Sequence, residues 1–421
     1  MVNNNIDPIM DVDIPADWEL LPLGKCVTEK LSYGINAPAI PYNSSFPCYI
    51  RITDITESGQ YDDTDKKSVE TDEKDKYTLA YGDIVLARTG ASTGKSYLYD
   101  KRDGDLVYAG FLIKASIDCD CHNPRFIVGQ LRTKRYWNWV AATSMRSGQP
   151  GINGKEYSSF LVPVAPKEEQ DRIADTLLCL DAYINDLEEL IKKKCDIRDG
   201  AQEDLMSRKT RIKGFDSEWV SYPFGEYFSL LPTNTYSRDQ LSDRGRVGNV
   251  HYGDVLIKYG DVLSDEDEIP RLKDDSKIKE RSYLKEFDVL IADTAEDDTV
   301  GKVVQIGRVS IPLVGGLHTI ACRPNYETAE GFLGYFMNSS IYHDQLYPYI
   351  TGIKVSSVSK KSFCETELTI PSDIKEQEAI VSILNVMNEE IKALEIEKEK
   401  MIQIREGAMD DLLTGRVRLT K

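Results

Sequence analysis

The stretch Ala87–Tyr97, ARTGASTGKSY, holds the residue types that bind a nucleotide phosphate. A phosphate-binding P-loop has the pattern Gly-x-x-x-x-Gly-Lys-[Ser/Thr], in which successive backbone N–H groups surround the phosphates before a helix begins. Here only three residues separate Gly90 from Gly94, and Thr89 occupies the place of the first glycine. The residues that follow, Tyr97-Leu98-Tyr99, favour a strand. The spacing argues against a nucleotide site, and we expect a turn between two strands.

Two neighbouring stretches contain residue types used in metal binding or catalysis. Cys119-Asp120-Cys121-His122 offers thiol and imidazole ligands, but a structural zinc site needs four ligands, usually as two spaced pairs, and the sequence has no second pair. Asn123-Pro124-Arg125-Phe126 is similar to the Asn-Pro-Pro-[Phe/Tyr] motif that holds a flipped adenine, but arginine replaces the second proline. No Gly-rich turn for S-adenosylmethionine follows a strand. We therefore expect no catalytic residue and no metal in this chain, and a helix start at Asn123.

The composition is that of an ordinary globular protein with room for two or three domains: 421 residues, of which 41% are hydrophobic and 29% charged. No apolar run approaches the length of a membrane span, so we expect no membrane contact and a cytoplasmic location. The net charge is −18, and three acidic runs, 54–75, 261–268 and 293–298, together carry −15 of it. The remainder is close to neutral, so the charge permits a DNA-binding surface without predicting one.

The chain contains two copies of one helical pattern, offset by 207 residues. Glu169-Gln170 recurs as Glu376-Gln377 at two expected helix starts, where we expect the pairs to act as caps, and Ile197–Ala201 recurs as Ile404–Ala408. Between these motifs the apolar residues are spaced 4, 3, 4, 3, which is the seam of a coiled coil. Each helix should have roughly 40 residues and a length of about 60 Å. The predicted seam consists of Ile173, Leu177, Leu180, Ile184 and Leu187 in the first copy, and Ile380, Leu384, Met387, Ile391 and Leu394 in the second.

The segments before the two helices repeat as well. Trp18-x-x-x-Pro22-x-Gly24 recurs at Trp219–Gly225, and GDIVLART at Gly82–Thr89 recurs as FDVLIADT at Phe287–Thr294. The sequence predicts two compact α+β domains, each followed by a long helix. We expect globular domains at 1–165 and 214–370 and helices at 166–213 and 371–421. Within the domains, strands are expected at 83–87, 106–115, 255–258 and 288–292, and helical stretches at 124–143 and 329–349.

The order and duplication of these motifs resemble the specificity (S) subunits of type I restriction-modification systems. The resemblance covers nearly the whole chain and rests on the twin Trp-x-x-x-Pro-x-Gly openings, on GDIVLARTG…GK with its degenerate copy, and on the twin Pro…Glu-Gln…heptad helices. It implies two tandem α/β target-recognition domains separated by two antiparallel coiled-coil helices, with internal pseudo-two-fold symmetry. Each domain would read half of a bipartite, asymmetric site in double-stranded DNA.

The resemblance also implies the partners of the chain. It would be a non-catalytic subunit that binds two methyltransferase (M) subunits and the restriction (R) subunits. It would have no cofactor of its own, whereas its partners would use S-adenosylmethionine, ATP and Mg²⁺. The length of the helices would set the number of unread base pairs between the half-sites.

Base-reading residues are expected in polar loops, because hydrogen-bond donors and acceptors distinguish base pairs in the major groove. Close approach to DNA is expected at the turn after residue 87 and at the Gly-rich loop 147–155. In the first domain the candidates are Arg51, Thr53, Arg88, Thr89, Ser92, Thr93, Lys95, Gln149, Asn153 and Lys155. In the second domain they are Asn249, His251, Tyr252, Thr294, Thr299, Lys302, His318, Thr351, Lys354, Ser356 and Ser357.

Alternatives remain for these residues and for the chain. Each candidate could be an ordinary solvated loop residue, and His251 and His318 could be structural histidines. The acids at 293–298 could accept hydrogen bonds from cytosine amino groups or face away from DNA. The alternative function is a coiled-coil interaction scaffold that reads no DNA. DNA affinity that falls steeply with salt would distinguish DNA reading from such a scaffold.

Overall fold

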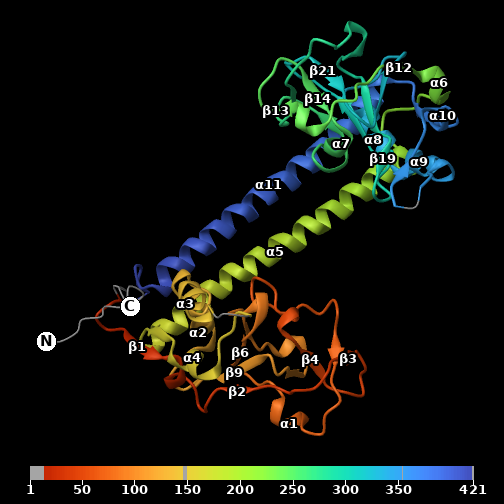
Figure 1. Cartoon of the computed structure of the whole chain (residues 1–421). Helices are drawn as coiled ribbons and strands as arrows, with labels where there is room; N and C mark the ends of the chain where they lie inside the picture. Colours follow the sequence, from red (N-terminus) through yellow and green to blue (C-terminus); the bar gives the residue numbers. More distant parts are fainter. Residues whose placement is uncertain (1–13, 146–148, 353, 420–421) are drawn as a thin grey trace. The chain divides into compact units, whose positions relative to one another are not determined.

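The computed structural model describes residues 14–145, 149–352 and 354–419, and the chain divides into two compact units (Figure 1). Unit 1 comprises Met1–Glu188 and Glu397–Lys421, and unit 2 comprises Glu189–Ile396. Two helices of 40 residues each, α5 (Lys167–Met206) and α11 (Ile374–Leu413), pass through both units. Each unit therefore combines one globular domain with about half of each long helix.

Two four-stranded sheets build the globular part of unit 1. Their strand orders are β2-β9-β6-β7 and β3-β5-β4-β8. Neighbouring strands are antiparallel except β4 and β8, which are parallel. Strand β6 is buried along its whole length, as its unbroken apolar run predicts. The strands are β2 (Ser32–Tyr33), β3 (Ile40–Pro41), β4 (Cys48–Ile50), β5 (Lys67–Ser68), β6 (Asp83–Ala87), β7 (Ser96–Leu98), β8 (Leu106–Tyr108) and β9 (Leu112–Ser116).

Unit 2 repeats this topology strand for strand. Its sheets have the orders β12-β22-β18-β20-β15 and β13-β16-β14-β21-β17, each with one strand added at the end. The pair β14 and β21 is again parallel. The repeated topology confirms the internal duplication and the α+β class. The strands are β12 (Phe228–Leu231), β13 (Leu241–Ser242), β14 (Gly248–Val250), β15 (Val262–Leu263), β16 (Arg271–Leu272), β17 (Tyr283–Leu284), β18 (Val289–Ala292), β20 (Val303–Ile306), β21 (Leu313–Gly315) and β22 (Thr319–Pro324).

A two-stranded antiparallel sheet closes each domain. Strand β1 (Glu19–Pro22) pairs with β10 (Leu161–Val164), and β11 (Trp219–Pro223) pairs with β24 (Glu367–Pro371). The duplicated Trp-x-x-x-Pro motif thus begins a strand that pairs with the strand just before the long helix. The shorter helices are α1 (Lys74–Tyr77), α2 (Pro124–Gln130), α3 (Lys134–Ser144), α4 (Gly154–Ser159), α6 (Phe224–Tyr227), α7 (Tyr252–Ile257), α8 (Phe332–Asn338), α9 (Ser340–His343) and α10 (Lys360–Phe363).

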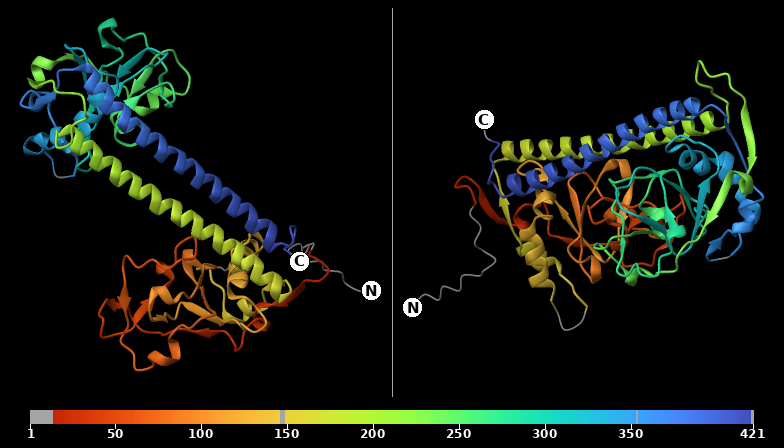
Figure 2. Two further views of the ribbon diagram at one scale, coloured as in Figure 1. Left: turned by 180° about the vertical axis from the view of Figure 1, so that it is seen from behind. Right: turned by 90° about the horizontal axis from the view of Figure 1, so that it is seen from above.

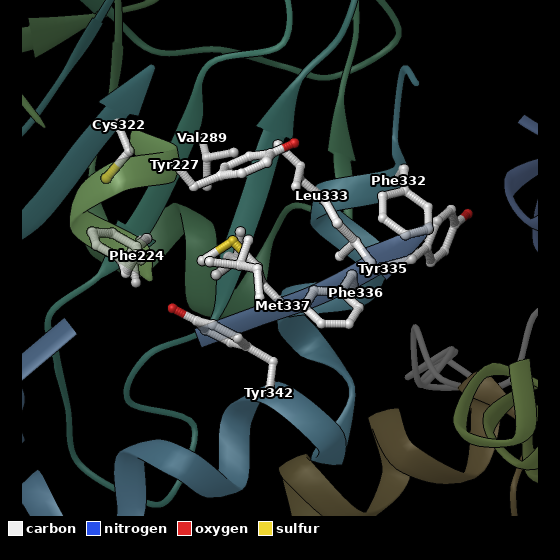
Figure 3. Close-up of a cluster of buried hydrophobic side chains, with 14 of the residues drawn as sticks. Phe224, Tyr227, Val289, Cys322, Phe332, Leu333, Tyr335, Phe336, Met337 and Tyr342 are labelled. Atoms are coloured by element: carbon white, nitrogen blue, oxygen red, sulfur yellow. The ribbon is translucent and has the colours of Figure 1, made fainter. Parts of the chain in front are cut away.

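The ends of the long helices belong to the cores of the domains. In unit 2, aromatic residues of α6, α8 and α9 surround Met337 (Figure 3), and Ile380 and Leu384 of α11 join the same buried cluster. In unit 1 the corresponding cluster includes Ile173 of α5 and Leu413 of α11. A helix end that shares a core with a globular domain is fixed in direction by that domain.

Within each unit the segments of α5 and α11 lie side by side (Figure 2), and the predicted seam lies on their less exposed side. Five of its residues are buried, namely Ile173, Leu187, Ile380, Leu384 and Ile391, and the other five are half-buried. In unit 1 the Arg405 guanidinium lies 2.9 Å from Asp181, and Lys398 lies 3.5 Å from Glu188. In unit 2 Lys194 lies 2.7 Å from Glu390. Residue numbers rise along one helix as they fall along the other, so the paired helices are antiparallel.

Two expectations about local structure were wrong. Residues 255–257 belong to helix α7, not to a strand, because His251 caps its first turn and Asp254 lies at its N-terminal end. The Glu-Gln pairs are not caps. Gln170 and Gln377 are buried, and each accepts a backbone N–H bond of 2.9 Å from the preceding domain, from Asn123 and Ala329 respectively. The duplicated pairs therefore join the long helices to the domains.

Asn123 caps α2 as expected, its side chain accepting N–H bonds from Arg125 and Phe126. No described helix combines the length and the apolar character of a membrane span.

Candidate nucleic-acid interface

The turn after β6 and the Gly-rich loop meet at one edge of unit 1. The Gly90 N–H donates to the Pro150 carbonyl at 3.1 Å, and the Ile152 N–H donates to the Arg88 carbonyl at 2.9 Å. Residues 147 and 148 of the loop lie outside the described residues. The structure thus brings together five of the predicted DNA-binding residues, which are Arg88, Thr89, Ser92, Gln149 and Lys155.

Arg88 is held in place by an aromatic ring. Its guanidinium carbon lies 4.9 Å from the centre of the Tyr33 ring, and the Tyr33 hydroxyl accepts the Gly154 N–H at 3.0 Å. Within the described ranges, no carboxylate lies at ion-pair distance from Arg88 or Lys155. Phe111 beside them is 58% exposed. This edge therefore offers two uncompensated cations and an exposed aromatic ring.

Other predicted residues of unit 1 use their polar groups inside the domain. The Arg51 guanidinium lies 2.6 Å from Asp54, and the Lys95 ammonium lies 2.7 Å from Glu57. The buried Thr93 hydroxyl donates to the Gly90 carbonyl. The Asn153 carbonyl oxygen caps α4. Arg51, Thr93, Lys95 and Asn153 thus use their polar groups within the domain, and their assignment to DNA binding stays a prediction. Thr53 is exposed and donates to Asp54.

The duplicated Gly-Lys motif supports the turn rather than a phosphate. Gly94 and Gly301 both have φ +95°, a region that favours glycine. The Lys302 ammonium donates to the carbonyls of Leu256 and Tyr259 at 3.0 and 3.1 Å, and burial lowers its pKa. The Lys302 ammonium thus binds backbone carbonyls beneath the turn, and its assignment to DNA binding stays a prediction.

Unit 2 repeats the edge with different side chains. Asp293 stands where unit 1 has Arg88, and its N–H donates to the His318 carbonyl just as the Arg88 N–H donates to Phe111. The Asp293 carboxylate accepts the Thr294 hydroxyl at 2.8 Å and lies 3.4 Å from Nδ1 of His318. Strand β19 (Thr294–Ala295) pairs with β23 (Ser356–Ser357) beside it.

An aromatic ring also packs in this edge of unit 2. The Tyr252 ring meets the His318 ring edge-on at 5.3 Å. His318 has φ +54°, a conformation that costs energy in a residue other than glycine and that clusters at binding sites. The structure thus brings together Tyr252, Thr294, His318, Ser356 and Ser357 of the predicted set.

The remaining candidates of unit 2 divide into buried and solvent-facing residues. Asn249 is fully buried and accepts a hydrogen bond from Asn234; its assignment to base reading stays a prediction. His251 is a structural residue as well, because its ring accepts the Gly253 N–H and burial lowers its pKa. Thr299 bonds to Asp297, and Lys354 and Thr351 are exposed. Glu296, Asp297 and Asp298 face solvent.

Comparison with known proteins identifies the architecture. Residues 42–195 match the family model described as the type I restriction modification DNA specificity domain. A Methanocaldococcus jannaschii protein named as the specificity subunit of the type I restriction enzyme MjaX is 23% identical over 440 aligned residues, which cover 97% of this chain and 95% of that protein. Over nearly its whole length the chain is similar to type I restriction-modification specificity subunits.

Solved structures agree with this assignment at the level of the fold. A chain from a structural study of complex assembly in a type I restriction-modification system covers 96% of this chain and 99% of that chain at 15% identity, with a TM-score of 0.56. The specificity subunit from M. genitalium covers 98% of both chains at 16% identity, with a TM-score of 0.53. The resemblance predicted from sequence is confirmed: the chain is similar in sequence and in fold to proteins named as specificity subunits.

Sequence reasoning missed two residues at the edge of unit 1, Tyr33 and Phe111. Tyr33 and Phe111 were overlooked because they lie at the ends of short strands far from the turn in sequence. The acids at 293–298 were considered together as acceptors for cytosine amino groups, and the match of Asp293 to Arg88 in the repeat singles out this residue.

Among the described residues, no group of three or more His, Cys, Asp or Glu side chains could hold a metal ion.

Proposed function

We propose that the two domains of this specificity subunit read the two halves of a bipartite, asymmetric DNA site. The observation that carries the proposal is the contrast between Arg88 and Asp293, which follow matched strands and make matched backbone bonds. Arginine donates two hydrogen bonds to guanine O6 and N7, whereas a carboxylate accepts from the cytosine amino group. The two domains share one fold but carry a hydrogen-bond donor and a hydrogen-bond acceptor at the same position, which suits them to reading two different half-sites.

The neighbours of Arg88 support a division of labour in unit 1. Lys155 is exposed and has no described acidic partner, so it can contact a phosphate, and Gln149 is exposed and can pair with adenine. Tyr33 holds the guanidinium from behind, which limits its motion before DNA binds. In unit 2 the candidate readers are acceptors and hydroxyls, namely Asp293, Thr294, Ser356 and Ser357, together with His318.

The outer faces of the long helices are proposed as docking sites for two M subunits. Ile197 and Ile404 stand at matched positions and are 59% and 53% exposed. Near them, a β-carbon added at Gly200 or Gly407 would meet no heavy atom within 4 Å outside its own helix backbone. A glycine inside a helix costs about 1 kcal/mol relative to alanine. A glycine three residues after an exposed isoleucine occurs once in each unit. This repeated pair would allow a helix of a partner protein to approach closely.

Two repeated faces suit two copies of one partner. We accordingly propose one S subunit with two M subunits, to which R subunits add, and the lengths of α5 and α11 as the spacer between half-sites. The partners would supply S-adenosylmethionine, ATP and Mg²⁺.

The test is to co-express the chain with its M subunit and to map methylated adenines on genomic DNA. Replacing Arg88 by alanine should relax or abolish recognition at one half-site, with a loss of about 1–3 kcal/mol of discrimination at the contacted base. The matched control is Arg102→Ala, which removes an exposed arginine elsewhere on unit 1. Equal methylation patterns for Arg88→Ala and the wild type would contradict the assignment of this edge. DNA affinity of the complex that does not fall with salt would favour the DNA-free scaffold.

A further inference from the structure

A cavity of about 310 Å³ in unit 1 has no role in the recognition or docking described above. It lies where the loop 56–59, the first turn of α3 and the last turns of α11 meet. Its cationic lining consists of Lys95, Arg132, Lys134 and Arg405, and Trp137 and Met409 supply apolar surface. Thr133 caps α3 at the wall of the cavity, so the positive end of an 11-residue helix also faces this space.

Arg132 lines the cavity, and its hydrogen-bonding capacity is only partly satisfied by the described residues. Its Nη2 donates to the Gly59 carbonyl at 3.2 Å, but its buried Nε has no hydrogen-bond partner. In the part of the chain that the structure describes, no carboxylate lies at ion-pair distance from it. Arg132 is half-buried, and a guanidinium that is partly withdrawn from water with its Nε unpartnered is costly; this burial lowers the pKa of Arg132 to about 10. An anion in the cavity would offset this cost.

The other charged groups that line the cavity are mostly paired already. Lys95 lies 2.7 Å from Glu57, and Arg405 lies 2.9 Å from Asp181. On the acidic side, Asp410 pairs with Arg416. Lys134 is exposed and has no ion pair among the described residues, so it is available together with Arg132. Glu406 at the rim is exposed and can turn toward solvent.

Unit 2 has a matching cavity of about 470 Å³ with the opposite character. The 207-residue offset places Arg198 for Arg405, Asp199 for Glu406 and Glu203 for Asp410. At the position of Arg132 stands Asn338, whose Nδ2 donates to the Asp261 carboxylate at 2.7 Å and to the Val303 carbonyl at 2.8 Å. Asp261 and Asp344 add two more acids to the lining. The basic character of the unit 1 cavity is therefore not a by-product of the duplicated fold.

We propose that the unit 1 cavity is a binding site for a phosphate group, with Arg132 as its principal ligand and Lys134 and the start of α3 as supporting donors. Arginine binds phosphate through paired, charge-assisted hydrogen bonds, and helix N-termini provide backbone N–H groups for the same anion. The volume exceeds what a phosphate needs, and Trp137 and Met409 can contact the organic part of a phosphate ester. The cavity lining includes none of Arg88, Thr89, Ser92, Gln149 and Lys155, and the proposal does not depend on the DNA-reading edge, although Lys95 belongs to the same turn.

Isothermal titration of inorganic phosphate into the full chain tests the site. The wild type should bind one phosphate saturably, Arg132→Gln should bind about tenfold more weakly or not at all, and the surface control Arg102→Gln should bind like the wild type. Circular dichroism establishes that each variant is folded. Should Arg132→Gln fail to fold, Lys134→Gln changes an exposed residue and should also weaken binding. Absence of saturable binding, or equal binding by Arg132→Gln, would overturn the proposal.

Two sources of the phosphate can be separated by repeating the titration with excess duplex DNA. A phosphate of the DNA backbone should block inorganic phosphate from the cavity. A free phosphate ester should leave inorganic phosphate binding intact in the presence of DNA, and adenosine monophosphate should then compete with it and change the tryptophan fluorescence through Trp137.

Discussion

Replacing Glu169 by glutamine should destabilise unit 1 strongly, because this carboxylate ties together three segments that are distant in sequence. Glu169 is 1% exposed at the start of α5. It accepts hydrogen bonds of 2.8 and 2.7 Å from Arg418, which follows α11, and one of 3.1 Å from the Trp18 indole before β1. The chain repeats the arrangement in unit 2, where Glu376 accepts from Arg211 and Trp219.

The expected loss follows from the burial of the pair. Breaking a buried ion pair by removing one partner costs about 3–5 kcal/mol. The lower end applies here, since Arg418 keeps its ion pair with Asp17 and its side chain is 26% exposed. Urea unfolding followed by circular dichroism at pH 7 measures the difference. The matched control is Asp175→Asn, which removes an exposed carboxylate from the same helix and should change stability by no more than about 0.5 kcal/mol.

The pH dependence tests the electrostatic origin of this difference. The bonds from Arg418 hold the pKa of Glu169 below its ordinary value of 4.5. A depressed pKa contributes stability that is complete above the unfolded value and is lost as pH falls through the folded value. The gap between wild type and Glu169→Gln should therefore be constant from neutrality to about pH 5 and should shrink at lower pH. Equal stabilities at pH 7, or a gap that persists in acid, would refute the reasoning.

Three further changes probe the helices. Leu384→Ala should cost unit 2 about 2–5 kcal/mol in urea unfolding, because Leu384 is 0% exposed in the core, whereas Val386→Ala, at a 54% exposed position, should be nearly neutral. Gly200→Ala should stabilise the isolated chain by up to about 1 kcal/mol in urea unfolding. Gly200→Arg should leave the chain folded but reduce the amount of M subunit that co-purifies with it. If the M subunit co-purifies fully with Gly200→Arg, it does not dock on this face of α5. Inserting seven residues after residue 188 in α5 and seven after residue 396 in α11 lengthens both helices and keeps the coiled-coil seam in register. This double insertion should abolish methylation of the original site. Unchanged methylation of that site would contradict the role of the helices as the spacer.

The fold was largely predictable because the sequence contains two copies of the same arrangement of elements. Apolar residues spaced 4, 3, 4, 3 between two copies of one motif predict paired helices, and the structure has two helices of 40 residues. The segment 255–258 was not predictable in the same way. Its β-branched and apolar run fits a strand by composition, and only the capping by His251 and the packing of the domain make it helical.

The role of the Glu-Gln pairs depended on contacts that no local pattern reveals. Glu169 meets Trp18 across 151 positions and Arg418 across 249. The Trp-x-x-x-Pro motif and the Glu-Gln pair were both visible in the sequence, but nothing in their spacing indicates that Trp18 and Glu169 are in contact.

The candidate site was found as a region but not residue by residue. Duplication located the turn after residue 87 and its copy after residue 292. Which side chains are free there depends on tertiary contacts: Lys95 and Asn153 are engaged within the domain, whereas Arg88 is not paired with any described carboxylate. Tyr33 and Phe111 reach the edge from other strands, and sheet pairing rather than sequence proximity brings them to it.

The measurement that tests the central claim most directly is a genome-wide map of methylated adenines at single-base resolution, made in cells that express the M subunit with and without this chain. The account predicts methylation at one bipartite, asymmetric sequence with an unread gap of constant length, present only when the chain is expressed. Methylation that is unchanged when the chain is absent, or that appears at a continuous site without a gap, would contradict it.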